Sequence, residues 1–359
     1  MSKELIYVGT FSERESEGIY VFELHRETRQ LNLIQTIESK KSPTFLAIHP
    51  NGKYLFSVNR EAVGSNKDWG SVTSFSINQN TGRLTVLNET TSYGTSPCHI
   101  SIYPQGNWLF ISHYETGNLV ILPVTKSGKV GIASQNLQLT GSSIHPERQT
   151  HARTHSTIPS FDGRHLYVAD LGIDKVMIYN FYPKNGTVQS AKQPWIEVTP
   201  GAGPRHFTIH PNSEYAFLAE EMTSTVNAFK VDPNDGSLTS YAKLSTLPND
   251  FEGYNSTADI HINTAGTTLY VSNRGLNSIA IFEINPGNGE IKFRKNVPSG
   301  GEFPRNFLLE PQGQFAFVAN RNSDNVVLFE IDQSGNLTET ATQVMVPSAV
   351  CIKYLEITQ

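Results

Sequence analysis

Apolar residues along the chain form short runs separated by polar turns. Six segments share one order of features: a short apolar strand, a turn rich in Pro, Gly or Asn, and a second apolar strand that ends in polar residues. Short apolar runs on either side of such a turn predict β-hairpins. The six predicted hairpins span residues 42–60, 96–114, 154–171, 204–221, 257–274 and 304–321.

The predicted hairpins recur at a nearly constant interval. Successive second strands start 47 to 57 residues apart, counted at their first apolar residues, which are Leu55, Leu109, Leu166, Ala216, Leu269 and Ala316. A seventh second strand begins at Leu5, 50 residues before Leu55. Self-similarity at a period of this size indicates a repeat fold. The chain therefore contains seven structural units.

Two further strands follow the predicted hairpins. Residues 71–78, 175–181, 225–231, 278–284 and 325–331 alternate between apolar and polar positions, and a turn rich in Asn, Gly, Asp or Pro then leads to a weaker strand. Four strands in each of seven units predict an all-β, seven-bladed β-propeller of four-stranded antiparallel blades. No segment has a sustained 3.6-residue apolar period, so we expect few helices.

The two ends of the sequence predict how the ring closes. The chain begins at a second strand and lacks a first strand, whereas residues 347–354 resemble the first strands of the other units. We therefore expect the N- and C-terminal strands to pair in one blade, which leaves no open sheet edge. Each unit packs only on its neighbours, so we predict that residues 1–359 form one domain.

Composition narrows the possible partners. The chain has 28 Lys and Arg against 33 Asp and Glu, a formal net charge of -5, and no run of basic residues. This balance argues against nucleic acid and anionic membranes as partners. No apolar stretch approaches the roughly 20 residues that span a bilayer, and the first residues have no signal-like apolar core. We therefore expect a cytoplasmic protein. We also expect no disulfide, because Cys98 and Cys351 each lie in an apolar segment where a small buried thiol is common.

Polar side chains gather at one end of the predicted hairpins, opposite the turn. The starts of first strands contribute Cys98, His99, Thr154, His155, Arg205, His206, Asp259, Arg305 and Asn306. The exits of second strands contribute Asn59, Arg60, His113, Tyr114, Asp170, Glu220, Glu221, Asn273, Arg274, Asn320 and Arg321. The long connections 60–70, 141–153 and 248–257 reach the same end. Because the innermost strands of a propeller line its channel, we predict that much of this set converges on the axis.

Several arginines in one pocket of an acidic protein indicate an anionic ligand, because a guanidinium matches carboxylate and phosphate oxygens in pairs. For a single Asn or Asp the alternative is that it braces neighbouring blades. His151 and His155 have the spacing of a zinc-binding helix, but no Glu follows His151 and the segment is a loop entering a strand. There is no GxSxG segment either. We expect neither a metal nor a cofactor.

Seven segments taken together carry a resemblance to a known family. They are YVGTF at 7–11, SPCHISIYPQGNWLFISHY at 96–114, RQTHARTHS at 148–156, DGRHLYVADLGIDKV at 162–176, GPRHFTIHPNSEYAFLAEE at 203–221, LYVSNRGLNSIAIF at 269–282 and FPRNFLLEPQGQFAFVANRNSDNVVLF at 303–329. In this order and spacing, the chain resembles the propeller lactonase family that contains bacterial 6-phosphogluconolactonase and fungal carboxymuconate cyclase. The resemblance covers essentially the whole length.

The resemblance implies a cleft with one histidine, two arginines and a glutamate. Matched onto this sequence they are His155, Arg205, Arg274 and Glu221. Arg148 and Gln149 match the Arg-Gln step that precedes the family's histidine. One position departs from the pattern: Arg153 stands where family members commonly carry the first histidine of a His-x-His step. His155 is therefore the histidine that the resemblance carries over.

The reaction that the resemblance implies is hydrolysis of a sugar-acid lactone, with 6-phospho-D-glucono-1,5-lactone of the pentose phosphate pathway as the expected substrate. We assign His155 as general base, unless it only caps a strand, and Glu221 either orients it or is itself the base. Arg205 and Arg274 would bind phosphate or stabilise the oxyanion. The remaining candidate substrate-binding residues are Arg148, Gln149, His113, Asp170, Asn273, Arg305 and Arg321.

Two other functions remain open at this point. The same cationic cleft would suit a cycloisomerase that closes an unsaturated dicarboxylate to a lactone. A propeller is also a common platform for non-enzymatic interactions, and fold does not imply function. The sequence predicts a small anionic lactone as the partner and makes no prediction of the oligomeric state.

Overall fold

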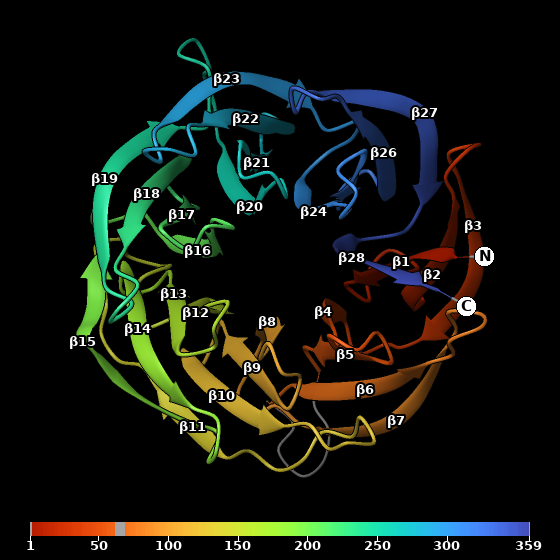
Figure 1. Ribbon diagram of the computed structural model, residues 1–359, viewed down its shortest axis with the longest axis horizontal. Helices are drawn as coiled ribbons and strands as arrows, with labels where there is room; N and C mark the ends of the chain where they lie inside the picture. Colours follow the sequence, from red (N-terminus) through yellow and green to blue (C-terminus); the bar gives the residue numbers. More distant parts are fainter. Residues whose placement is uncertain (1, 62–68, 359) are drawn as a thin grey trace.

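The chain folds into a ring of seven sheets around a central axis (Figure 1). The computed structural model describes residues 2–61 and 69–358. Within them, 28 strands form seven four-stranded antiparallel sheets, and no helix is present. The predicted seven-bladed propeller is thereby confirmed. Part of the predicted long connection 60–70, residues 62–68, lies outside the described residues.

The blade that joins the two ends of the chain has strand order β28-β1-β2-β3. Its strands are β28 (Ala349–Ile357), β1 (Lys3–Thr10), β2 (Gly18–His25) and β3 (Gln30–Glu38). β28 pairs antiparallel with β1 from Lys3 opposite Ile357 to Gly9 opposite Cys351. The C-terminal strand is thus the innermost strand of the blade that the N-terminus begins, which confirms the predicted ring closure.

The other six blades run through the chain in order, each from its innermost strand outward. The next three are β4 (Pro43–Ile48), β5 (Tyr54–Asn59), β6 (Ser71–Ile77) and β7 (Leu84–Thr91); β8 (Pro97–Ile102), β9 (Trp108–His113), β10 (Asn118–Pro123) and β11 (Gln135–Gln138); and β12 (Thr154–Pro159), β13 (His165–Asp170), β14 (Lys175–Tyr182) and β15 (Thr187–Glu197). The last three are β16 (Pro204–Ile209), β17 (Tyr215–Glu220), β18 (Thr225–Val231) and β19 (Leu238–Ser245); β20 (Ser256–Ile262), β21 (Thr268–Arg274), β22 (Ser278–Ile284) and β23 (Ile291–Pro298); and β24 (Pro304–Leu309), β25 (Phe315–Asn320), β26 (Asn325–Ile331) and β27 (Leu337–Met345).

The second and third strands of each blade form the packed interior. Leu109, Phe110 and Ile111 of β9 have no exposed surface, because both faces of a blade are covered by its neighbours. The outermost strands are more exposed, as in β27, where Leu337 is the one buried residue. In the described part of the chain, no helix is long and apolar enough to cross a membrane.

Three buried tyrosines each form a hydrogen bond to the neighbouring blade. The hydroxyls of Tyr7, Tyr167 and Tyr270 donate to the carbonyls of Gly82, Gly236 and Gly335 in the next blade, at 2.9, 3.0 and 2.8 Å. Each of these bonds satisfies a hydroxyl that burial would otherwise leave unpaired. The repeated hydrogen bond holds the blades in fixed register around the axis, and so fixes the strand ends that meet there.

Candidate active site

A β-bulge at the start of the innermost strands aims side chains at the axis. The pairing of β12 with β13 skips from Thr154 to Ser156, and that of β16 with β17 skips from Pro204 to His206. The same skip leaves Thr44, Cys98, Arg305 and Val350 unpaired in their own blades. A bulge bends the strand locally and re-aims the extra residue. His155 and Arg205 are therefore presented to the axis by the same backbone device in adjacent blades.

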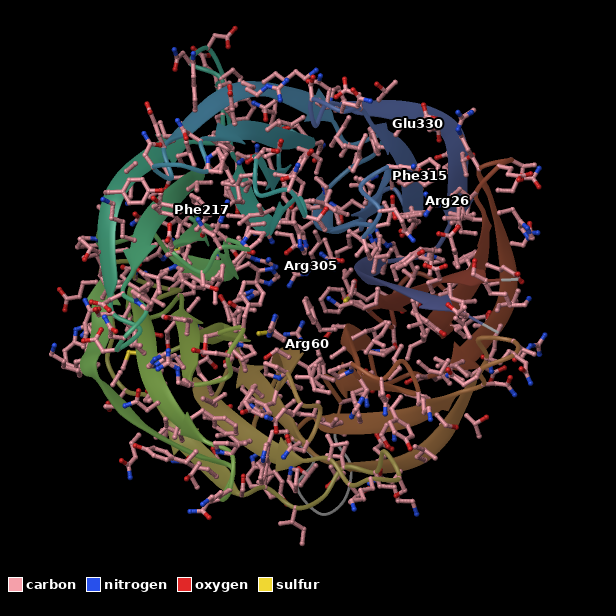
Figure 2. All side chains as sticks on the ribbon, in the orientation of Figure 1. Arg26, Arg60, Phe217, Arg305, Phe315 and Glu330 are labelled. Carbon is pink, nitrogen blue, oxygen red and sulfur yellow. The ribbon has the colours of Figure 1, made fainter. Side chains whose placement is uncertain are left out.

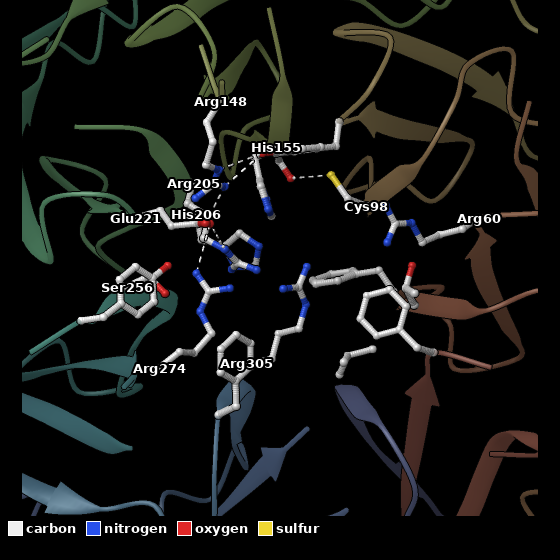
Figure 3. Close-up of a pocket in the computed structure, with 17 residues that line it drawn as sticks. Arg60, Cys98, Arg148, His155, Arg205, His206, Glu221, Ser256, Arg274 and Arg305 are labelled. Carbon is white, nitrogen blue, oxygen red and sulfur yellow. Dashed lines mark hydrogen bonds and ion pairs between the residues drawn. The ribbon is translucent and has the colours of Figure 1, made fainter. Parts of the chain in front are cut away.

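The bulged residues line one cavity of about 310 Å³ at this end of the channel (Figure 3). Figure 2 shows Arg60 and Arg305 pointing into the central opening, whereas Arg26 and Glu330 lie at the outer rim. Five arginines and one carboxylate take part in the lining, which consists of Phe11, Thr44, Phe45, Arg60, Cys98, Tyr114, Arg148, His155, Arg205, His206, Glu221, Tyr254, Ser256, Arg274, Phe303, Arg305 and Val350.

Glu221 sits at the centre of an arginine cluster. Its carboxylate oxygens lie 2.7 Å from Arg148, 2.9 Å from Arg205 and 3.1 Å from Arg274. Burial opposes ionisation, but these three guanidinium groups hold the pKa of Glu221 far below its usual range. The carboxylate therefore stays ionised at every working pH. Since its lone pairs are engaged by arginines, Glu221 organises the cluster and is a weak proton acceptor.

The cluster is also anchored to the backbone. Arg205 donates to the carbonyl of Ala258 at 2.6 Å, and Arg274 donates to that of Thr257 at 2.6 Å. Both side chains are almost completely buried. These two guanidinium groups are thus held in place before any ligand arrives, which is the condition for stabilising developing charge efficiently.

Arg305 differs from the clustered arginines. Within the described residues it has neither an ion-pair partner nor a hydrogen-bond acceptor, and its guanidinium lies 5.4 Å from the centre of the Phe11 ring. Burial and the nearby Arg205 and Arg274 hold the pKa of Arg305 well below its usual value. A positive charge in this position gains most from an incoming anion.

His155 lines the same cavity with only 3% of its surface exposed. Burial, followed by the charge of Arg205, keeps the pKa of His155 well below its usual value, so its imidazole is neutral. Its Nδ1 is buried and has no hydrogen-bond partner among the described residues. No hydrogen bond joins His155 to Glu221 there, so the predicted orientation of His155 by Glu221 is not what this geometry provides.

Comparison with known proteins places this arrangement in a family. The family model described as "Lactonase, 7-bladed beta-propeller" matches residues 5–354. The chain belongs to this lactonase family. It is 36% identical to a 6-phosphogluconolactonase of Bacillus subtilis, with 99% of each chain covered, and 34% identical to a 6-phosphogluconolactonase of Formosa agariphila, with 95% of this chain and 96% of that protein covered.

The similarity extends from the sequence to the three-dimensional structure. The periplasmic gluconolactonase of Pseudomonas aeruginosa superposes with a TM-score of 0.92 at 29% identity, and each chain is covered completely. The family and these relatives identify the chain as a lactone-hydrolysing enzyme. The resemblance read from the sequence is therefore confirmed, and the reading as a non-enzymatic platform falls away.

In this lactonase, three predicted substrate-binding residues lie outside the cavity. His113, Asp170 and Asn273 occupy the bracing positions, which we define as the second-strand residues opposite the last innermost-strand residue that pairs before the bulge: Asn59, His113, Asp170, Glu220, Asn273 and Asn320. All six are at most 2% exposed. Asp170 accepts from the backbone of Arg153 and Gly172, and Asn273 donates to the carbonyl of Thr246. Their side chains form hydrogen bonds inside the ring and are not part of the cavity lining.

After four of the six bracing positions, the next residue turns toward the axis. Arg60, Tyr114, Glu221 and Arg274 follow bracing positions and line the cavity. We call these four the pocket positions. Successive side chains on a strand point to opposite sides. The sequence-based prediction took both residues at five of the six exits and so mixed the two registers.

The remaining residues that the sequence predicted for the site also divide into some that line the cavity and some that do not. Arg148 lines the cavity, whereas Gln149 next to it is buried and donates to the carbonyl of Leu171 at 2.8 Å. Arg321 is not part of the lining, because it pairs with Glu13 at 2.7 Å and lies 4.8 Å from the centre of the Phe11 ring. His151 points to the carbonyl of Glu115 at 2.9 Å, away from any metal-like arrangement.

Sequence reasoning overlooked Phe11. Its ring contacts three guanidinium groups, those of Arg60, Arg305 and Arg321, at 5.4, 5.4 and 4.8 Å. The repeat contained a signal for it, because β1 is the second strand of its blade and Phe11 stands where Arg60 stands in the next blade. Counting this position in all seven units would have placed Phe11 in the cavity.

Proposed function

We propose that this lactonase hydrolyses 6-phospho-D-glucono-1,5-lactone to 6-phosphogluconate. The observation that carries the proposal is the charge of the cavity, where five arginines meet a single carboxylate. Glu221 compensates part of the charge on three of them, and Arg305 has no carboxylate beside it in the described structure. A phosphorylated substrate supplies the missing negative charge. The names of the curated relatives support the same substrate.

We assign the phosphate to Arg305 and the reacting carbonyl to the neighbourhood of His155 and Arg205. Among the residues that the structure describes, the guanidinium of Arg305 has no protein acceptor, and phosphate is an anion that a guanidinium binds through two parallel hydrogen bonds. Arg205 and Arg274 are already fixed by Glu221 and by backbone carbonyls. Their fixed position suits them to an oxyanion, whose charge appears only during the reaction.

In the proposed reaction, the neutral imidazole of His155 takes a proton from water while the water oxygen bonds to the carbonyl carbon. The guanidinium of Arg205 stabilises the resulting oxyanion. Collapse of the intermediate breaks the bond between that carbon and the ring oxygen, and the ring oxygen takes the proton from His155. The product is a hydroxy acid, which releases one proton as its carboxyl group ionises.

The test compares two substrates in the purified enzyme. We expect kcat/KM for the phosphorylated lactone to exceed that for glucono-1,5-lactone by at least about 10-fold, the equivalent of one good ionic contact. Inorganic phosphate should inhibit competitively. Equal kcat/KM values for the two lactones would reject the phosphorylated substrate. Formation of a lactone from a carboxymuconate would instead favour the cycloisomerase that the sequence left open.

We infer that the enzyme acts in the cytoplasm. A phosphorylated sugar lactone does not cross membranes, because it carries a permanent charge. One structural neighbour is described as periplasmic, so the fold is compatible with either compartment. Cell fractionation with an antibody against the protein tests the location, and recovery in a secreted or periplasmic fraction would contradict it.

A further inference from the structure

The arginines of the cavity are held in two different ways. Three of them contact the carboxylate of Glu221. Arg60 and Arg305 contact no carboxylate among the residues that the structure describes, and the guanidinium carbon of each lies 5.4 Å from the centre of the Phe11 ring. Both arginines line the cavity (Figure 3). One aromatic ring therefore takes the place beside these two arginines that a carboxylate takes beside the other three.

An aromatic ring and a carboxylate hold a guanidinium with different consequences. A carboxylate cancels the positive charge and accepts the N–H groups. The face of a ring attracts the cation through its quadrupole, but the ring carries no net charge and no lone pair. Arg60 also donates to the hydroxyl of Ser96, which is uncharged as well. Arg60 and Arg305 are therefore held without losing the charge that an anionic ligand needs.

Phe11 is itself fixed in the wall of the cavity. Its side chain is buried, and its backbone N–H donates to the carbonyl of Ser348 at 3.1 Å. A third guanidinium, that of Arg321, lies 4.8 Å from the ring centre, pairs with Glu13 at 2.7 Å and does not line the cavity. The ring thus has one neighbour whose charge is already compensated, and two in the lining that have no carboxylate beside them in the described structure.

We propose that Phe11 is a positioning residue that selects phosphorylated lactones, because it holds Arg60 and Arg305 together as the phosphate site. The two guanidinium carbons lie within twice 5.4 Å of each other, since each lies that far from the same ring centre. A phosphate group carries a charge of about −1.5 to −2 at pH 7, which matches two guanidinium charges. The proposal rests on the proposed phosphorylated substrate, and it adds Arg60 and Phe11 to the phosphate site assigned to Arg305.

This arrangement determines which kinetic constant depends on Phe11. None of the three arginines on Glu221 contacts the Phe11 ring among the described residues, and those arginines carry the proposed oxyanion. Without the ring, Arg60 and Arg305 are ordered only when the ligand binds, which weakens binding. The loss of the ring should therefore raise KM for a phosphorylated substrate and leave kcat unchanged, the mark of an interaction made equally before and during the reaction.

The direct test is the dissociation constant of inorganic phosphate, measured by calorimetry at pH 7 without lactone. Ordering one free side chain on binding costs roughly 2- to 12-fold in a binding constant, and Phe11 holds two such side chains. We expect Phe11→Leu and Arg60→Met each to raise the dissociation constant about 10-fold. An unchanged constant in Phe11→Leu would overturn the proposal. An unchanged constant in Arg60→Met would overturn the two-arginine site and leave the phosphate to Arg305 alone.

A series of fluorinated rings separates the charge distribution of Phe11 from its shape. Fluorine atoms weaken the negative face of the ring with little change in its size. Incorporation of mono-, di- and trifluorinated phenylalanine at position 11 should raise the dissociation constant of phosphate with each added fluorine. A constant value across the series would mean that the ring acts by packing alone and would overturn the proposal. The same series decides the question if Phe11→Leu does not fold.

The matched control is Phe315→Leu. Phe315 is 6% exposed, as Phe11 is, and the guanidinium of Arg26 lies 5.0 Å from its ring centre. Figure 2 shows this pair near the outer rim, away from the central opening. Thermal melts should show similar losses in the two Phe→Leu variants, whereas only Phe11→Leu should change the dissociation constant of phosphate. Equal changes in that constant would overturn the proposal, because phosphate binding would then follow stability.

Kinetics distinguish a failure of this inference from a failure of the proposed substrate. Phe11→Leu should raise KM for 6-phospho-D-glucono-1,5-lactone about 10-fold, and should keep kcat, as well as KM for glucono-1,5-lactone, within about twofold of the wild type. A loss confined to kcat, or an equal rise in both KM values, would overturn the role of Phe11. Equal kcat/KM values of the wild type for the two lactones would reject the phosphorylated substrate, and the phosphate titration would still decide whether Phe11 holds an anion site.

Discussion

At the ends of four second strands, two adjacent residues have different roles. The bracing positions are buried and hydrogen-bonded inside the ring, whereas the pocket positions that follow them line the cavity. Asp170 and Asn273 belong to the first group, and Glu221 and Arg274 belong to the second. One step along a strand turns a side chain to the other side. Neighbouring residues of one repeated motif therefore serve two purposes: the first supports the ring and the second contributes to the cavity.

The largest effect is expected where a pocket position also holds the structure together. Glu221→Gln leaves Arg148, Arg205 and Arg274 without their counter-charge, and breaking a buried ion pair from one side costs about 3–5 kcal/mol. We expect this loss in the free energy of unfolding, measured by urea titration at pH 7. Inorganic phosphate should restore part of it by binding the arginines.

The pH dependence of the same variant has a defined sign. The pKa of Glu221 is lowered by the arginines, so its stabilising contribution is present above the unfolded pKa of about 4.3 and disappears as the pH falls below it. The difference between wild type and Glu221→Gln should therefore shrink below about pH 4. Equal stability of the two proteins at pH 7 would contradict the role given to Glu221.

A pure effect on catalysis is expected at the bulged position His155. His155→Ala removes the proton acceptor and should lower kcat about 10²-fold or more, the usual contribution of general acid–base catalysis. Its melting temperature should stay within a few degrees of the wild type, because His155 has no hydrogen bond through its side chain in the described structure. Steady-state kinetics and a thermal melt of one preparation measure both. Turnover near the wild-type rate would remove His155 from the mechanism.

The opposite behaviour is expected at a bracing position. Burial raises the pKa of Asp170 to about 7, against about 3.9 for an unfolded Asp. Between these values the folded chain keeps a proton that the unfolded chain has lost, so the stability falls as the pH rises, by about 1 kcal/mol per pH unit between pH 5 and 7. Asp170→Asn should abolish this slope.

The kinetics of the same variant sharpen the comparison. Asp170 lies outside the cavity, so kcat and KM of Asp170→Asn should match the wild type at a temperature where both proteins are folded. Urea titrations at several pH values give the slope, and initial rates give the kinetics. A changed KM with an unchanged pH slope would mean that Asp170 contacts the substrate after all.

The smallest effect is expected at Arg305, which we propose to bind the phosphate and which has no ion-pair partner in the described part of the chain. Arg305→Met should raise KM for the phosphorylated lactone about 10-fold and leave KM for the unphosphorylated lactone unchanged. It should also raise the melting temperature slightly, since it relieves repulsion with Arg205 and Arg274. Arg164→Gln, at an exposed arginine paired with Asp162, is the matched control and should change neither quantity. A lower melting temperature for Arg305→Met would assign Arg305 a structural role.

Much of the molecule could be predicted from the sequence, because the repeat imposes the fold. The periodic second strands, from Leu5 to Ala316, predicted seven blades and the closure of the ring by residues 347–354. The resemblance named His155, Arg205, Glu221 and Arg274, and all four line one cavity. Their roles stay proposals, as does the reading of residues 1–359 as one domain.

What the sequence did not reveal depends on register and on long-range pairing. The alternation that buries Asn273 in the ring and turns Arg274 toward the cavity is visible only once the bulges set the strand register. The bond between His206 and Asp259 joins two blades across 53 positions, and no local pattern predicts it. Phe11 was missed because its unit is split between the two ends of the chain.

The central claim is that the bulged and pocket positions together form a site for a phosphorylated sugar lactone. A crystal structure of the enzyme with 6-phosphogluconate, the product, tests it most directly. We predict the phosphate within hydrogen-bonding distance of Arg305 and the carboxylate between His155 and Arg205. A phosphate bound at the other mouth of the channel, or a product that contacts neither Arg305 nor His155, would contradict the account.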